Sequence, residues 1–226
     1  MIDNLASLAD RWTVVFHQGE AIEAQLTSRV ARWVWSIAPV YALQPFYFER
    51  NNQKRGEVLE TESLEEAFVF QYGLDARDKP LIQYEYGVGE DPIRSQFYQY
   101  HEQAVEVLHF KTVHDEDENG LMLQQLERLN QSAQKPSQYL MMTSDWHIQH
   151  STRFIETYTY ENDLLVRVDK NEAQLLKGVM VSALTGEEQF FYTPDQHLKR
   201  IEEYLQYELS DELRETRTVK YVRNAS

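Results

Sequence analysis

From residue 40 onward, apolar and polar residues alternate along the chain in short runs, which are joined by short polar links. Three of these runs are FYFER at 46–50, EAFVFQYG at 66–73 and PLIQYEYG at 80–87. Alternation with a period of two places the apolar side chains on one face of a β-strand. Links such as DARDK and VGEDP are too short for a parallel crossover, which needs a dozen residues or more. The sequence therefore predicts a long antiparallel β-meander.

The full set of expected strands covers about half of the chain after residue 40. They are 46–50, 66–73, 80–87, 93–100, 104–113, 138–144, 152–160, 164–169, 178–184, 188–193, 198–207 and 217–222. The meander they form can be an open, curved sheet or a closed, lipocalin-like barrel. The number of strands does not decide between the two, because closure depends on the register between strands.

Residues 1–39 have a different period, which is that of a helix. A first helix is expected to end at Gly19, and its apolar residues are spaced three and four apart, namely Leu5, Leu8, Trp12, Val15 and Phe16. A second helix is expected from Glu20 to Ile37, with Pro39 stopping it. The predicted fold class is therefore α+β: an N-terminal helical segment, followed by an antiparallel sheet over 40–226, in one compact domain.

The stretch HDEDENGLMLQQLERLN interrupts the alternation. It opens with Asp115, Asp117 and an Asn-Gly pair, as calcium-binding loops do. Such a loop takes a bidentate Glu at its twelfth position, where this chain has Leu126. An acidic turn before a helix explains the same residues, because carboxylates favour a helix N-terminus. We therefore expect a helical insertion near 115–136, with Asp115 and Asp117 as an acidic binding site.

A second candidate site is the segment DWHIQH, which contains Asp145, His147 and His150. Two histidines and a carboxylate can hold zinc or non-haem iron, with a further ligand from His109 or His114. A polar loop explains these residues equally well. The chain has no Cys, which excludes thiol catalysis, and it lacks the sequence motifs of α/β-hydrolases, dinucleotide sites and P-loops. We expect no catalytic residue and no cofactor, with Ca²⁺ or Zn²⁺ as the alternative.

The formal net charge of −15 at pH 7 limits the class of partner. A field of this sign repels nucleic acids and anionic membranes and attracts basic proteins. Tyrosine anchors many protein interfaces, and we expect Tyr98, Tyr100, Tyr158 and Tyr160 to contribute to a binding surface. The chain shows no signal-peptide pattern and no apolar stretch long enough to span a bilayer. A cytoplasmic protein with a basic partner is expected.

Two segments resemble the tyrosine–aspartate hairpin repeats of bacterial Rhs-type shell proteins. YTYENDLLVRV, at Tyr158–Val168, has the Tyr pair and an acid of that repeat, and YTPDQHLKRI, at Tyr192–Ile201, has its Tyr, Leu and Ile. This resemblance implies stacked hairpins. The N-terminal LASLADRWTVVFHQGEAIEAQ is similar to the beginning of the bilin lyases, in which a helix precedes a lipocalin-like barrel. That resemblance implies a barrel holding a small apolar ligand or chromophore.

Taken together, the charge, the tyrosines and the lack of catalytic motifs favour one class of function. The chain is expected to be a non-enzymatic, acidic protein-binding module, of the immunity or inhibitor type found in bacteria. The first alternative is a ligand- or chromophore-binding barrel. The second is a metal-dependent hydrolase that uses Asp145, His147 and His150.

Overall fold

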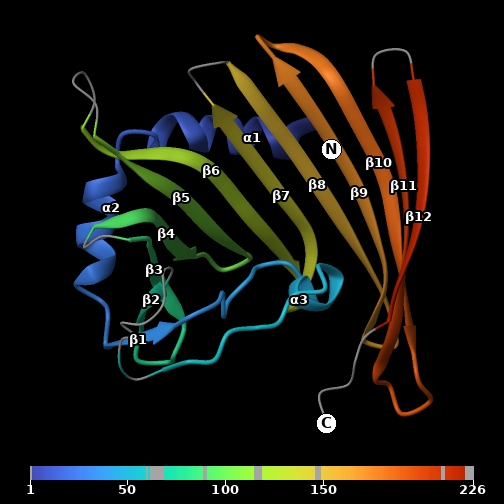
Figure 1. Cartoon of the computed structure of the whole chain (residues 1–226), viewed down its shortest axis with the longest axis horizontal. Coiled ribbons are helices and arrows are strands. Elements are labelled where there is room, and N and C mark those ends of the chain that lie inside the picture. The colour runs from blue at the N-terminus through green and yellow to red at the C-terminus, as the bar shows by residue number, and fades with distance from the viewer. Residues whose placement is uncertain are drawn as a thin grey trace. The chain divides into compact units, whose positions relative to one another are not determined.

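The computed structural model describes residues 2–59, 61, 69–88, 91–114, 119–145, 149–209 and 212–221 (Figure 1). Within them the helices are α1 (Ile2–Val15), α2 (Gly19–Thr27) and α3 (Tyr47–Arg50). The strands are β1 (Arg32–Ser36), β2 (Val69–Leu74), β3 (Pro80–Tyr86), β4 (Pro92–Tyr100), β5 (Ala104–His114), β6 (Asn119–Ser132), β7 (Lys135–Asp145), β8 (His150–Glu161), β9 (Leu164–Leu176), β10 (Val179–Tyr192), β11 (Leu198–Leu209) and β12 (Glu212–Tyr221). None of the described helices combines the length and apolar character needed to cross a bilayer.

The twelve strands follow the sheet order β1 to β12, so that each strand lies beside its neighbour in sequence. The registers from β1 to β5 and from β7 to β12 are antiparallel throughout. Tight turns join many of them, and those between β6 and β7, β8 and β9, and β9 and β10 contain residues with positive φ. The predicted antiparallel meander after N-terminal helices is therefore confirmed.

The chain divides into two compact units, and each is described by itself. The first unit contains residues 1–43 and 54–128, and the second contains 44–53 and 129–226. The short segment 44–53, which includes α3, thus belongs with the C-terminal strands although it lies in the chain between two parts of the first unit.

The core of the first unit is centred on β3, β4 and β5. Phe97 of β4 lies opposite Ile82 of β3 and Leu108 of β5, and all three side chains are fully buried. The ring of Phe97 also packs 5.4 Å from that of Phe110. Helix α2 begins directly against this core at Gly19, where an added Cβ would lie 2.7 Å from the Cβ of Leu121. Only glycine permits this close approach, because real Cβ atoms do not come so near.

The expected helix from Glu20 to Ile37 is partly wrong. Helix α2 ends at Thr27, and residues Arg32–Ser36 form strand β1 instead. In β1 the side chains of Val34 and Ser36 are buried, while their neighbours are more exposed, which is the alternation of a strand. The segment is short and rich in Val and Trp, and an apolar run of this length fits both periods.

The expected strand at 46–50 is also wrong, because Tyr47–Arg50 is a single helical turn, α3. Phe46 precedes the turn with a φ of 54°, in the left-handed region. Phe48 and Arg50 are buried, so alternate residues point inward as they would in a strand. This alternating burial is the reason why the sequence pattern of the segment predicted a strand.

The helical insertion expected near 115–136 is wrong as well, because β6 and β7 occupy residues 119–132 and 135–145. Leu123, Leu126 and Leu129 are all buried. Positions three apart lie on opposite faces of a strand, so β6 buries leucines on both of its faces. A strand of this kind loses its alternation and has the three-residue spacing of a helix.

Candidate functional site

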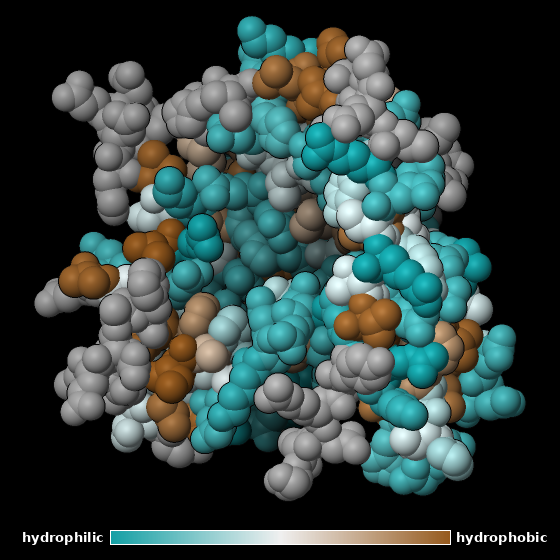
Figure 2. Space-filling view, turned by 45° about the vertical axis from the view of Figure 1, so that its right-hand side comes forward, coloured by the Kyte–Doolittle hydropathy of each residue, from teal (hydrophilic) through white to brown (hydrophobic). Residues whose placement is uncertain are grey.

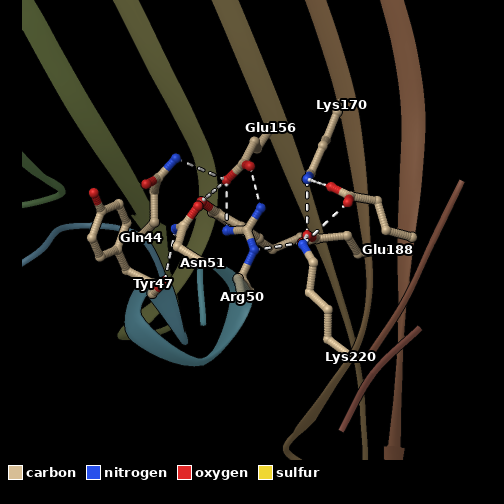
Figure 3. Close-up of polar contacts among 10 residues, drawn as sticks. Gln44, Tyr47, Arg50, Asn51, Glu156, Lys170, Glu188 and Lys220 are labelled. Carbon is tan, nitrogen blue, oxygen red and sulfur yellow. Dashed lines mark hydrogen bonds and ion pairs between the residues drawn. The ribbon is translucent and has the colours of Figure 1, made fainter. Parts of the chain in front are cut away.

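The second unit contains a buried ionic cluster that links α3 to the sheet (Figure 3). Its members are three cationic and three carboxylate side chains, namely Arg50, Lys170, Lys220, Glu156, Glu188 and Glu203. Apart from Arg50, they come from strands β8 to β12. Glu156 lies opposite Lys170, and Glu188 lies opposite Glu203, in the strand registers. Glu156 therefore faces a cation in the register, whereas Glu188 and Glu203 face each other and take their counter-charges from lysines of the flanking strands β9 and β12.

Arg50 forms the centre of the buried ionic cluster. Its Nη1 donates to Oε2 of Glu156 at 3.0 Å, its Nη2 donates to the other oxygen of that carboxylate, and its Nε donates to Glu188 at 2.5 Å. The side chain of Arg50 is 5% exposed, and those of the two glutamates are 1% exposed. Burial alone would lower the pKa of Arg50, but the Glu156 and Glu188 carboxylates raise it. The guanidinium is therefore permanently charged and held on both sides.

The lysines complete the charge balance of the buried ionic cluster. Lys170 Nζ lies 2.9 Å from Glu188 and 2.7 Å from Glu203, and Lys220 Nζ lies 3.1 Å from Glu203. Burial acts to raise the pKa of Glu203, but Lys170 and Lys220 hold it below its ordinary value. Every carboxylate of the cluster thus has a cationic partner. Such saturated pairing suits an anchor for the segment 44–53 and not a nucleophile or an acid–base catalyst.

The first unit has a smaller ionic cluster around Glu106 of β5. Its carboxylate accepts from Arg11 Nε of α1 at 3.1 Å and from Arg128 Nε of β6 at 2.9 Å, and His101 Nε2 lies 3.3 Å away. Burial acts to raise the pKa of Glu106, but Arg128 and Arg11 lower it below its usual range. This cluster fastens α1 to the strands of its own unit.

The free energy of unfolding is expected to fall on acidification. Glu106 and Glu203 both have a lowered pKa in the folded protein, so below an unfolded pKa of about 4.3 the unfolded chain binds more protons. Their stabilisation is complete above that value and is lost as the pH falls through the folded pKa. Urea denaturation between about pH 3 and pH 7 measures this. Glu203→Gln should flatten the curve, whereas the exposed Glu161→Gln should not; equal slopes in both variants would contradict the assignment.

An apolar, exposed turn joins β9 to β10, and we call residues 176–181 the β9–β10 tip (Figure 1). Leu176, Val179, Met180 and Val181 in this segment are 41%, 67%, 62% and 42% exposed. They are four of the eleven large hydrophobic side chains that are exposed among the described residues. Gly178 forms the turn with a φ of 79°, and an added Cβ there would meet no atom within 4 Å. The tip therefore extends into open space.

The exposure of three consecutive apolar residues in the tip has a cause in the strand register. Met180 lies opposite Leu175, and Ser182 lies opposite Gln174, so Val181 is an extra residue in β10. A β-bulge of this kind breaks the alternation of inward and outward side chains. On the face shown in Figure 2, hydrophilic residues cover most of the described surface, and hydrophobic residues form small, separate patches. The concentration of apolar side chains at the tip is therefore a distinct feature.

A shallow groove of about 520 Å³ lies over β9 to β12 on the second unit. Its polar walls include Arg167, which lies 3.0 Å from Glu187, and Arg217, which packs 5.1 Å over the ring of Tyr204. Arg217 also donates to Glu202 at 2.9 Å. Both guanidinium groups of the groove therefore contact side chains of the same sheet, Arg167 at Glu187 and Arg217 at Tyr204 and Glu202.

The tyrosines expected at a binding surface are distributed between cores and surfaces. Tyr98 and Tyr158 are buried, and burial raises the pKa of each well above its ordinary value. Tyr100 and Tyr160 are more accessible, and a lysine lies over each ring, at 5.0 Å and 5.6 Å. Tyr98 and Tyr100 belong to the first unit, and Tyr158 and Tyr160 belong to the second unit. The structure therefore does not assemble the four into one patch within either unit.

The other predicted site residues are only partly placed. Asp115, Asp117 and His147 lie outside the described residues. Asp145 and His150 face each other across the β7–β8 pair. In the part of the chain that the structure describes, no group of three or more His, Asp or Glu residues is arranged to hold a metal ion.

His109, one of the two histidines suggested as a further metal ligand, is paired within its own unit. Its Nε2 lies 2.8 Å from a carboxylate oxygen of Glu127 on the next strand. The atoms are close but their angle does not suit a hydrogen bond, so the contact is an ion pair when the imidazole is protonated.

Comparison with protein-family models and with curated proteins finds no match. The site must therefore be interpreted from its own geometry. Sequence reasoning missed both the buried ionic cluster and the β9–β10 tip. The tip does have a sequence indication, because LLKGVMV places a Lys-Gly turn between apolar residues on both sides. The cluster has no comparable indication, since Arg50 is separated from Glu156 by 106 positions.

Proposed function

We propose that the protein is a non-enzymatic protein-binding module and that the β9–β10 tip is the centre of its contact surface. The observation that supports this is the exposure of Leu176, Val179, Met180 and Val181 in one turn. Contiguous exposed apolar side chains mark interaction sites more often than ordinary surface. Flexible Met and branched Val side chains fit an apolar pocket of a partner, where a few buried anchors supply most of the binding energy.

The negative charge of the chain indicates a second property of the partner, namely a basic surface around its apolar pocket. The net charge is −15. Exposed carboxylates lie on strands beside the tip: Asp145 is in the same cross-strand row as His150 and Leu176, and Glu208 lies opposite Ala183. Complementary charge steers association and raises its rate. A module of the immunity or inhibitor type, which acts by occupying a basic protein, would use such a surface.

The test is a comparison of binding by four forms of the protein. Partners captured by the wild-type chain are identified and purified, and their affinities are measured by calorimetry. Val179→Asp and Met180→Asp should each weaken binding by about tenfold or more, since each places a charge in an apolar pocket. The control is Val88→Asp, because Val88 is 94% exposed and belongs to the first unit.

Two outcomes decide the matter. Loss of affinity in the tip variants alone, with association slowed by added salt in all forms, is the expected result. Equal affinities for wild-type, Val179→Asp and Met180→Asp would remove the tip from the contact surface and with it this proposal.

A further inference from the structure

Strand β12 is the last strand in the sheet order, and it pairs with β11 along one side. Among the residues that the structure describes, no strand lies on its other side (Figure 1). The side chains from Arg214 to Val219 are all exposed. An edge of this length presents unpaired backbone N–H and C=O groups, which are a template for a further strand.

Charged residues on edge strands usually prevent such pairing, and β12 has several. Their order, however, is self-complementary. When two copies of β12 lie antiparallel with Thr216 facing Thr216, Glu215 of each copy faces Arg217 of the other. Opposite charges at directly opposed positions of a sheet are favourable, and like charges are unfavourable.

Two other registers also place the same face of each strand on the same side of the joined sheet, but both bring like charges together. A register centred on Arg217 places this residue opposite itself and Arg214 opposite Lys220. A register centred on Glu215 places two carboxylates face to face. A shift by one residue would instead exchange the two faces of the strand. The Thr216-centred register is therefore the favourable one of the three.

We propose that two copies of this chain associate through β12, with Thr216 on the two-fold axis and the sheets joined edge to edge. A two-fold axis makes every contact occur twice, which is the commonest symmetry of protein dimers. Glu215 has no ion-pair partner among the described residues of its own chain. Arg217 is 61% exposed and contacts Glu202 through one nitrogen, so it keeps donors for a second carboxylate. The pairing surface is separate from the β9–β10 tip.

Cysteine cross-linking tests the register directly, because the chain contains no Cys of its own. Thr216→Cys places two thiols at directly opposed positions, where Cβ atoms lie about 5 Å apart and a disulfide is within reach after small shifts. Thr218→Cys is the matched control, being an exposed threonine on the same face of the same strand. In the proposed dimer its two copies are four residues apart along the strands, about 13 Å. On oxidation, Thr216→Cys should form at least about ten times more covalent dimer; equal yields would overturn the register.

Charge reversal provides a second, independent test by sedimentation. Glu215→Arg and Arg217→Glu should each convert the dimer to a monomer, because each creates two opposed like charges. Mixing the two variants should restore a dimer, since every opposed pair is then again of opposite sign. Glu208→Arg, on the exposed part of β11, should leave the dimer unchanged. A wild-type chain that stays monomeric at high micromolar concentration, or a mixture that stays monomeric, would overturn the proposal.

Discussion

Replacing Arg50 by Met is expected to lower the free energy of unfolding by about 3–5 kcal/mol, which is the usual cost of breaking a buried ion pair from one side. The substitution removes the cation that contacts both Glu156 and Glu188. These carboxylates are 1% exposed, so water cannot replace the lost partner. Chemical denaturation monitored by circular dichroism measures the change.

A matched control and a rescue separate this electrostatic effect from lost packing. Arg153→Met removes an exposed arginine from β8 and should change stability by no more than about 0.5 kcal/mol. Combining Arg50→Met with Glu156→Gln should recover part of the loss, because Glu188 keeps Lys170 as its partner and no carboxylate of the cluster then lacks a counter-ion. A double variant less stable than Arg50→Met alone would show that packing, and not charge, dominates at α3.

Phe97→Ala is expected to destabilise the first unit by about 3–5 kcal/mol, the typical range for a large aromatic residue removed from a core. Phe97 is fully buried, opposite Ile82 and Leu108 and beside the ring of Phe110. The strands on both sides hold the surrounding side chains in place, so the cavity can close only in part. The loss combines the apolar transfer energy with the empty volume that remains.

Two further variants serve as controls for the stability change of Phe97→Ala. Phe97→Leu keeps most of the volume and should be clearly more stable than Phe97→Ala. Ile93→Ala alters the same strand at a side chain that is 41% exposed and should have a small effect. A cost for Phe97→Ala no larger than that for Ile93→Ala would mean that this face of β4 is not the core of its unit.

The antiparallel meander could be predicted because most strands keep a polar turn at each end and an uneven burial of neighbouring residues. In β8, for example, Tyr158 is buried between the exposed Thr157 and Thr159. The prediction failed where both faces of an element are buried or where the element is a single turn. Leu123 and Leu126 of β6 are both buried, and apolar residues three positions apart are also typical of a helix. Tyr47–Arg50 is too short for its period to be recognised.

The candidate site was far less predictable, and the reasons are physical. Arg50 meets Glu188 across 138 positions, and an acidic chain offers many equally plausible carboxylates. Tyrosine is a common interface residue, but the strand register directs the side chains of Tyr98 and Tyr158 into the cores of their own units. The exposure of Val181 depends on a β-bulge, which shifts the faces of one strand by one residue. Such shifts arise from the pairing of strands and leave no trace in composition.

The assignment of segment 44–53 to the second unit has a consequence for inheritance. A polypeptide that begins at residue 129 contains β7 to β12 with Glu156 and Glu188, but it lacks Arg50. A single genetic crossover between residues 53 and 129 would therefore combine these carboxylates with the cation of a different parent. Where the parents differ at position 50, the recombinant leaves Glu156 and Glu188 without this cation and is expected to lose stability. The charge pairing therefore couples the sequence of segment 44–53 to that of the C-terminal strands.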